Sequence, residues 1–338
     1  MILYLLRRLF LLAFVFIALS ILAFSLGYLF PGDPLQNFTG LRTIPTEQLP
    51  ALLSEYRMDK GYVQQYIGYL QRTFSGDWGL SFASQQPLLL EIKLLLPATL
   101  ELAAYALLIS FFFGIPLGII AAIKPNGAVS KSISALALTG YSLPVFWWAL
   151  LLIMIFSLWL GWLPTAGRIG VLYEIPYNTG FMLLDILLAQ SQYQQEALLN
   201  ALRHLLLPTI VLATFPTTVM IRFTRDSMLE VWEQSYIKTA RAKGLSRSQV
   251  LYRHALRNAL LPVTRQIGLQ FSTLITLAMI TEVIFSWPGI GRWLIDSIYQ
   301  RNFPAIQSGL LIISTLVISV NMLTEVLHTL FNPLARKR

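Results

Sequence analysis

The chain has 338 residues, of which 56% are hydrophobic and only 12% charged, and its mean hydropathy is +0.63. This composition excludes an ordinary soluble domain and indicates a polytopic membrane protein. The formal net charge is +9, but the cations cluster beside apolar segments, so we expect a membrane surface as partner and no nucleic acid. The sequence has no cysteine, which excludes disulfides and thiol catalysis.

Near its start the chain carries two arginines, followed by 22 uncharged residues, 9–30. This run is longer than the roughly 7–15 apolar residues of a secretory signal peptide. Ala23-Phe24-Ser25 would serve as a cleavage site in such a peptide. The length instead favours an uncleaved first transmembrane helix over residues 1–30.

Residues 31–95 form the first polar region of the chain. Leu and Tyr residues recur at helical spacing between Thr46 and Phe74, which predicts short helices. Gly76 and Gly79 mark a turn after them. We expect a small helical lobe on the outer, periplasmic face of the membrane.

Five further apolar segments predict five more spans. They cover residues 97–123, 133–160, 204–221, 268–285 and 305–331. Together they make a five-helix core over residues 96–331. Pro144 lies in the middle of the third span, where it predicts a kink. Gly114 and Gly118 have the GxxxG spacing that allows close helix packing, although this spacing also arises by chance.

The charge distribution predicts the orientation of the chain. Of the 25 Lys and Arg residues, 16 fall on the side that holds both ends, and the segments on that side are short. We therefore expect six spans with both termini in the cytoplasm. A basic cytoplasmic tail would cover residues 332–338.

The longest basic segment between two spans covers residues 222–266 and carries nine Lys or Arg residues. It predicts two short helices separated at Gly244, because glycine suits the left-handed position that follows a helix. Ser246 and Gln249 have the spacing of a capping box at the start of the second helix. Arg253 and Arg257 are four residues apart and share one face of that helix.

Two interpretations of this segment are open. Its cations can follow the positive-inside rule and contact lipid head groups. Alternatively, the order of helix, glycine, capped helix and Leu261-Pro262 indicates a shaped element that docks on another protein.

Residues 239–245 (TARAKGL) and 253–262 (RHALRNALLP) resemble the cytoplasmic signature loop of inner-membrane permease subunits of ABC importers, in the dipeptide/oligopeptide branch. The strings PGDP, GDWGLS and SLPVFW are similar to the same branch. LYEIPYNTGF, with the Gln-rich stretch after it, resembles the Sap subgroup, which is assigned to antimicrobial peptides. The resemblance implies an all-α polytopic membrane protein with six transmembrane helices and the ABC type I importer permease fold, in the bacterial inner membrane.

In that family the loop carries a coupling helix that sits in a groove of a separate ATPase. The residues to which the resemblance assigns this contact are Lys238, Thr239, Ala240, Arg241, Ala242, Gly244, Arg253, Arg257 and Pro262. Lys238 stands where the family pattern has Glu, so an ion pair made by that Glu would be absent or reversed.

The resemblance further implies a second, homologous permease in a heterodimer, two ABC ATPase subunits and a periplasmic substrate-binding protein, working by alternating access. The chain has no GxxxxGK[ST] motif, so we expect it to bind no cofactor and to be no enzyme, with ATP and Mg²⁺ in the ATPase subunits. It has no HExxH motif and its three histidines are far apart, which argues against a metal site.

Polar side chains within the spans are costly and often functional. Glu101 and Glu282 lie near the outer ends of their spans, and Asn321 and Glu325 share a stripe of the last span. These groups either pair between helices or line a path for a cationic substrate. The candidates for a translocation path are Glu282, Asn321 and Glu325.

The sequence thus predicts the permease subunit of an ABC transporter that imports peptides. The alternative is a secondary transporter or exporter of a small cationic solute such as a polyamine, although no internal inverted repeat is visible. A membrane assembly factor without transport is a third reading. The cargo is left open among dipeptides, antimicrobial peptides, polyamines and haem.

Overall fold

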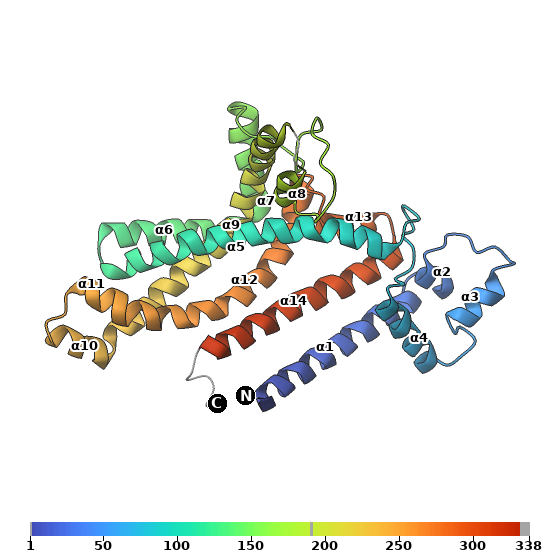
Figure 1. The fold of residues 1–338 in the computed structure, drawn as a ribbon, viewed down its shortest axis with the longest axis horizontal. Coiled ribbons are helices and arrows are strands. Elements are labelled where there is room, and N and C mark those ends of the chain that lie inside the picture. The colour runs from blue at the N-terminus through green and yellow to red at the C-terminus, as the bar shows by residue number, and fades with distance from the viewer. Residues whose placement is uncertain (1, 190–191, 332–338) are drawn as a thin grey trace. The chain divides into compact units, whose positions relative to one another are not determined.

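The computed structural model describes residues 2–189 and 192–331, so the predicted basic tail, residues 332–338, lies outside the described residues. Within these ranges the regular structure is helical, apart from one isolated bridge between Leu80 and Pro87 (Figure 1). The helices are α1 (Ile2–Leu29), α2 (Pro34–Thr39), α3 (Leu49–Glu55), α4 (Tyr62–Ser75), α5 (Leu88–Ile123), α6 (Ala128–Ser142), α7 (Val145–Leu152), the π-helix η1 (Ile153–Trp159), α8 (Met182–Leu188), α9 (Gln194–Glu233), α10 (Ser235–Ala242), α11 (Arg247–Val250), the π-helix η2 (Leu251–Ala255), α12 (Leu256–Ile284), α13 (Ile290–Tyr299) and α14 (Phe303–Phe331). The prediction of an all-α chain is confirmed.

Among the described residues, five helices contain a stretch long and apolar enough to cross a membrane, namely those in α1, α5, α9, α12 and α14. The predicted third span, residues 133–160, is not a single kinked helix, because α6 and the α7–η1 segment meet at a break bent by 103°. Pro144 accounts for the break. A residue before proline is forced out of the helical region, and Leu143 has φ −73° and ψ 124°. The predicted total of six spans is reached with this bent pair taken as one.

The chain forms two compact units. Unit 1 contains α1–α4, the start of α5, α13 and the first part of α14. Unit 2 contains the rest of α5, the helices from α6 to α12, and the end of α14.

Unit 2 is built on α9, which packs against both α6 and α12. This helix runs over 40 residues, well beyond the predicted span of residues 204–221, and Pro208 and Pro216 lie inside it without ending it. Proline is tolerated inside membrane helices because neighbouring groups can satisfy the freed backbone carbonyls. Side-chain hydrogen bonds hold α9 to its neighbours: Ser227 Oγ donates to the carbonyl oxygen of Ala259 at 2.8 Å.

The second half of α5 lies directly against α9. A Cβ atom added to Gly114 would lie 2.6 Å from Met220 Cβ. One added to Gly118 would lie 2.7 Å from the carbonyl oxygen of Ile221. Both distances are below normal contact, so the two backbones approach closely only because these residues have no side chain.

In unit 1 the short helices α2 to α4 pack on the end of α1 through aromatic rings. The ring of Phe24 on α1 lies 5.3 Å from that of Phe38 on α2 and 5.7 Å from that of Tyr69 on α4. Asn302 ties the loop before α5 to the start of α14: its amide donates to Ser81 Oγ at 2.8 Å and accepts from the backbone N–H of Phe82 at 2.9 Å. These contacts confirm a small helical lobe after the first span.

We predict that Gly118→Ala lowers the thermal stability of the purified protein in detergent. The new methyl group would push α5 away from α9, and overpacking of this kind costs about 1–3 kcal/mol. The matched control is Gly61→Ala, because a Cβ at Gly61 meets no atom within 4 Å. Equal melting temperatures for the two variants would contradict direct helix contact at Gly118.

Candidate functional site

The basic segment forms a compact element at one end of unit 2, where α10 and α11 follow α9 (Figure 1). Gly244 separates the two helices with φ +79°, the left-handed conformation expected of it. Ser246 and Gln249 form the predicted capping box: the N–H of Gln249 donates to Ser246 Oγ at 3.3 Å, and the N–H of Ser246 donates to Gln249 Oε1 at 2.9 Å. The predicted order of helix, glycine and capped helix is confirmed.

One face of α10 is buried in the chain's own core. Ile237 is fully buried and Ala240 is 7% exposed, and both belong to an apolar cluster with residues of α9, α11 and α12. Ala240 therefore packs inward, and its small side chain is not on the outer surface where the family pattern places the ATPase contact. The other predicted contact residues of α10, Lys238, Thr239, Arg241 and Ala242, are exposed.

The second helix of the element differs from the prediction. The capped turn α11 continues through the π-helix η2 into α12 without interruption, so it is the first turn of a long helix. Arg253 and Arg257 are exposed, but Arg253 lies in the π-helical turn, where spacing differs from that of an α-helix. Pro262 lies inside α12 and does not separate the element from the span that follows.

Two arginines connect the element to the rest of unit 2. The guanidinium of Arg241 lies 4.8 Å from the ring centroid of Trp232 on α9, within cation–π range. Arg247 donates from Nη2 to the carbonyl oxygen of Ile123, the last residue of α5. Sequence reasoning missed the contact of Arg247, because its acceptor is a backbone atom 124 residues away. A cation at the carboxyl end of a helix is favourable, because it meets the unpaired carbonyls there.

The three candidates for a translocation path do not converge. Glu282 is fully buried near the end of α12. Asn321 on α14 donates its amide to Ser272 Oγ at 2.8 Å, about 15 Å along α12 from Glu282 at ~1.5 Å per residue. Glu325 lies one turn beyond Asn321 and is partly exposed. The contact of Asn321 is of the kind that joins helices.

A buried ion pair lies where the part of α5 that belongs to unit 2 begins. Arg168 donates from Nε to Glu101 Oε2 at 3.1 Å, and the side chains are 9% and 1% exposed. The other oxygen of Glu101 accepts from the backbone N–H of Leu183 at 3.2 Å. Glu101 thus joins α5 to the polar region after η1. Sequence reasoning did not identify Arg168 as its partner.

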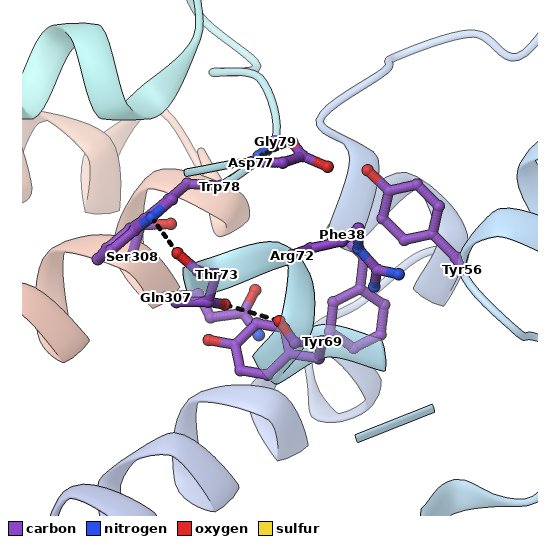
Figure 2. A pocket seen from close by; sticks show the side chains of 10 residues that line it. All are labelled: Phe38, Tyr56, Tyr69, Arg72, Thr73, Asp77, Trp78, Gly79, Gln307 and Ser308. Carbon is purple, nitrogen blue, oxygen red and sulfur yellow. Dashed lines mark hydrogen bonds between the residues drawn. The ribbon is translucent and has the colours of Figure 1, made fainter. Parts of the chain in front are cut away.

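Figure 2 shows a small cavity in unit 1, lined by α4, by the loop at residues 77–79 and by the start of α14. The guanidinium of Arg72 lies 3.8 Å from the ring centroid of Tyr56, and the indole N–H of Trp78 donates to the carbonyl oxygen of Thr73 at 3.0 Å. Burial raises the pKa of Tyr56 and of Tyr69 to about 12 and lowers the pKa of Arg72. The cavity volume of about 20 Å³ holds about one water molecule, so it is too small for a peptide.

We predict that Arg168→Gln destabilises the protein, because it leaves the Glu101 carboxylate buried without its cation. Breaking a buried pair in this way costs about 3–5 kcal/mol. The control is Arg292→Gln, which removes an exposed pair with Asp296 at 3.5 Å and should change stability by less than about 1 kcal/mol. Thermal unfolding of both variants in one detergent provides the comparison, and equal effects would contradict a special role for the buried pair.

Comparison with known proteins identifies the family. Residues 114–337 match the binding-protein-dependent transport system inner membrane component, and residues 1–103 match the N-terminal membrane component of the same system. The di/tripeptide transport system permease protein DppB of Pseudomonas aeruginosa is 46% identical over 330 residues, which are 98% of this chain and 97% of that protein.

Two further relatives carry the SapB name. The peptide transport system permease protein SapB of Salmonella typhimurium and the putrescine export system permease protein SapB of Escherichia coli K12 are each 42% identical over 337 residues, 100% of this chain and 98% of theirs. Both names, DppB and SapB, thus occur among full-length relatives of similar identity.

A solved structure shares the fold. It is the MetNI methionine ABC transporter in an inward-facing conformation, with a TM-score of 0.51, 15% identity, and coverage of 70% of this chain and 93% of that chain. With the family matches, this likeness agrees with the type I importer fold expected from the sequence. The chain belongs to the binding-protein-dependent transport system inner membrane component family and is an inner-membrane permease subunit of an ABC transporter.

Proposed function

We propose that this permease subunit imports peptides. The support is that the DppB relative and one SapB relative are named for peptide transport. The Escherichia coli SapB relative is named for putrescine export, so a polyamine is the second candidate cargo.

The surface formed by α10 and α11 is the proposed docking site for a partner ATPase. The observation that carries this assignment is its two-sided construction: Ile237 and Ala240 anchor α10 in the core, while Lys238, Arg241 and Gly244 face outward. A Cβ atom at Gly244 would meet nothing within 4 Å, so this point of the surface is open to a partner. The exposed cations fit an acidic rim on that partner.

The partners of the proposed assembly are those that membership of the family implies. A second, homologous permease would form a heterodimeric pore with this chain, and each permease would engage one of two ATPase subunits. ATP and Mg²⁺ are bound in the ATPases, and this chain binds no cofactor. A periplasmic substrate-binding protein delivers the cargo.

Movement of the ATPases would reach the spans through rigid contacts. Arg247 joins the element to the end of α5, and Ser227 joins α9 to α12. A push on α10 therefore displaces three spans of unit 2 together. Rigid displacement of packed helices is the step that alternating access requires.

We predict that Gly244→Asp lowers peptide uptake by about tenfold or more, a loss of about 1.4 kcal/mol in the coupling step. The carboxylate would project into the docking surface, while ATP hydrolysis by the partner subunits continues. Gly244→Asn separates the effect of charge from that of backbone strain, because Asn tolerates the left-handed conformation. Labelled dipeptide and labelled putrescine are measured in parallel in vesicles that hold the whole complex.

The matched control is Gly32→Asp. Gly32 also has a positive φ, +109°, and a Cβ there meets no atom within 4 Å, but it lies in unit 1. Normal uptake by Gly244→Asp would overturn the coupling assignment. Transport of putrescine without dipeptide would leave that assignment intact and replace the proposed cargo.

We predict that the α10–α11 element faces the cytoplasm and that the lobe of α2–α4 faces the periplasm. Because the chain has no cysteine, single variants Ser54→Cys and Lys243→Cys each carry one thiol. Both positions are exposed. A membrane-impermeant thiol reagent should label Ser54→Cys in intact spheroplasts and Lys243→Cys only after lysis. The reverse pattern would show the opposite orientation.

A further inference from the structure

An apolar groove runs between α1 and the start of α4 in unit 1. Its volume is about 620 Å³, within the range of roughly 300–1,000 Å³ that small-molecule sites occupy. The residues that line it are Ile21, Phe24, Ser25, Tyr28, Leu29, Tyr62, Val63 and Tyr66.

Two hydroxyl groups of the groove are already bonded within the chain. Tyr66 Oη lies 2.7 Å from Ser20 Oγ, and Ser25 Oγ donates to the carbonyl oxygen of Ile21 at 2.8 Å. An occupant therefore meets mainly carbon surface. Val63 is 72% exposed and Leu29 is 76% exposed, so much of this apolar surface is uncovered by the chain.

The groove continues the apolar surface of a membrane span. Phe14, Ile17 and Ile21 on α1 are between 47% and 62% exposed, and the span of α1 covers Leu6–Leu29. Lipid acyl chains contact such a surface. The groove lies within the last third of this span, at the end that carries the lobe.

A second cavity, of about 360 Å³, adjoins the groove at Tyr28 and Tyr62, which line both. Asp33, Lys60 and Gln65 give it a polar character. Gln65 is 6% exposed; its amide nitrogen donates to the carbonyl oxygen of Lys60 at 2.7 Å, but its Oε1 atom has no hydrogen-bond partner among the described residues. A buried acceptor without a donor is costly, so a donor from an occupant would be stabilising.

The same cavity holds the N-terminus of α4. Gly61 is the residue before this 14-residue helix, and no side chain caps it. The N–H groups of a first helical turn lack partners within the helix and attract anions, and Lys60 adds a positive charge beside them. Asp33 supplies the opposite charge across the cavity. The second cavity thus offers Lys60 and the start of α4 to an anion and Asp33 to a cation, and the adjoining groove offers apolar surface to a hydrocarbon chain.

We propose that the α1–α4 groove binds a phospholipid whose zwitterionic head group ends in a primary ammonium, as in phosphatidylethanolamine, from the membrane leaflet on the lobe's side. An acyl chain lies in the groove between α1 and Val63. The phosphate lies at Lys60 and the first turn of α4, and the ammonium group donates to Gln65 Oε1 and faces Asp33. The lipid would then hold the lobe to the first span.

The test uses the whole transporter complex in phosphatidylcholine vesicles that contain a small fraction of phosphatidylethanolamine with a photoreactive acyl chain. After irradiation, peptide mapping locates the label. We expect labelling of residues 21–29 and 62–66 to exceed that of the exposed residues 9–17 of α1 by about tenfold, the ratio for ~1.4 kcal/mol of preference. Ser25→Trp, which fills the groove, should remove this excess.

The control variant is Leu22→Trp, because Leu22 on α1 is 53% exposed and does not line the groove. It should keep the excess labelling. Even labelling along α1, or equal loss in both variants, would overturn the proposal. Photo-cross-links to another protein subunit from a photoreactive amino acid placed at Val63 would show that a protein covers the groove instead.

A competition experiment tests the same site in the unaltered protein. Unlabelled phosphatidylethanolamine in excess should compete with the probe, whereas diacylglycerol, which lacks the head group, should not. Inorganic phosphate should not compete either, which distinguishes a lipid site from a simple phosphate site. Equal competition by diacylglycerol would contradict head-group recognition at Lys60 and Gln65.

Discussion

Backbone atoms of α9 lie so close to Gly114 and Gly118 of α5 that no side chain fits between the two helices. The rest of unit 2 depends on this contact, because α9 also packs against α6 and α12 and leads directly into α10. Helices in a membrane gain little from hydrophobic association, since lipid is as apolar as they are, so close backbone packing must supply much of the stabilisation. The position of the proposed docking surface therefore depends on a helix contact far from it in the sequence.

The helix α10 at the proposed docking surface combines a buried apolar face and an exposed basic face in eight residues. Ile237 and Ala240 give α10 a buried face, while Lys238 and Arg241 are exposed. A diffuse basic loop would satisfy the positive-inside rule without either the buried face or the capping box. Two contacts support a rigid surface: Arg241 stacks on Trp232, and Arg247 donates to the last residue of α5.

Local signals in the sequence predicted the apolar spans, the left-handed Gly244 and the Ser246–Gln249 cap, since each depends on residues within one or two helical turns. The sequence predicted a kink at Pro144. The observed bend of 103° is larger, because Leu143 leaves the helical conformation. The π-helical turn at residues 251–255 and the continuation of α12 through Pro262 have no local signature. The partners of Arg247 and Glu101 are 124 and 67 residues away, and for Arg247 the partner is a backbone atom, so no spacing could reveal them. Glu282, Asn321 and Glu325 were grouped by type, whereas packing distributes them along the helices.

The continuity of α11, η2 and α12 makes the segment from Arg247 to Ile284 one continuous helical path of roughly 55 Å, at about 1.5 Å per residue. A bilayer core is about 30 Å thick, so this path is longer than one membrane crossing needs. If the segment tilts as one unit, a tilt of about 10° at one end moves the other by roughly 10 Å. Such a tilt would couple movement at one side of the membrane to movement at the other. The π-helical turn, with its wider winding, is the place where such a segment can bend.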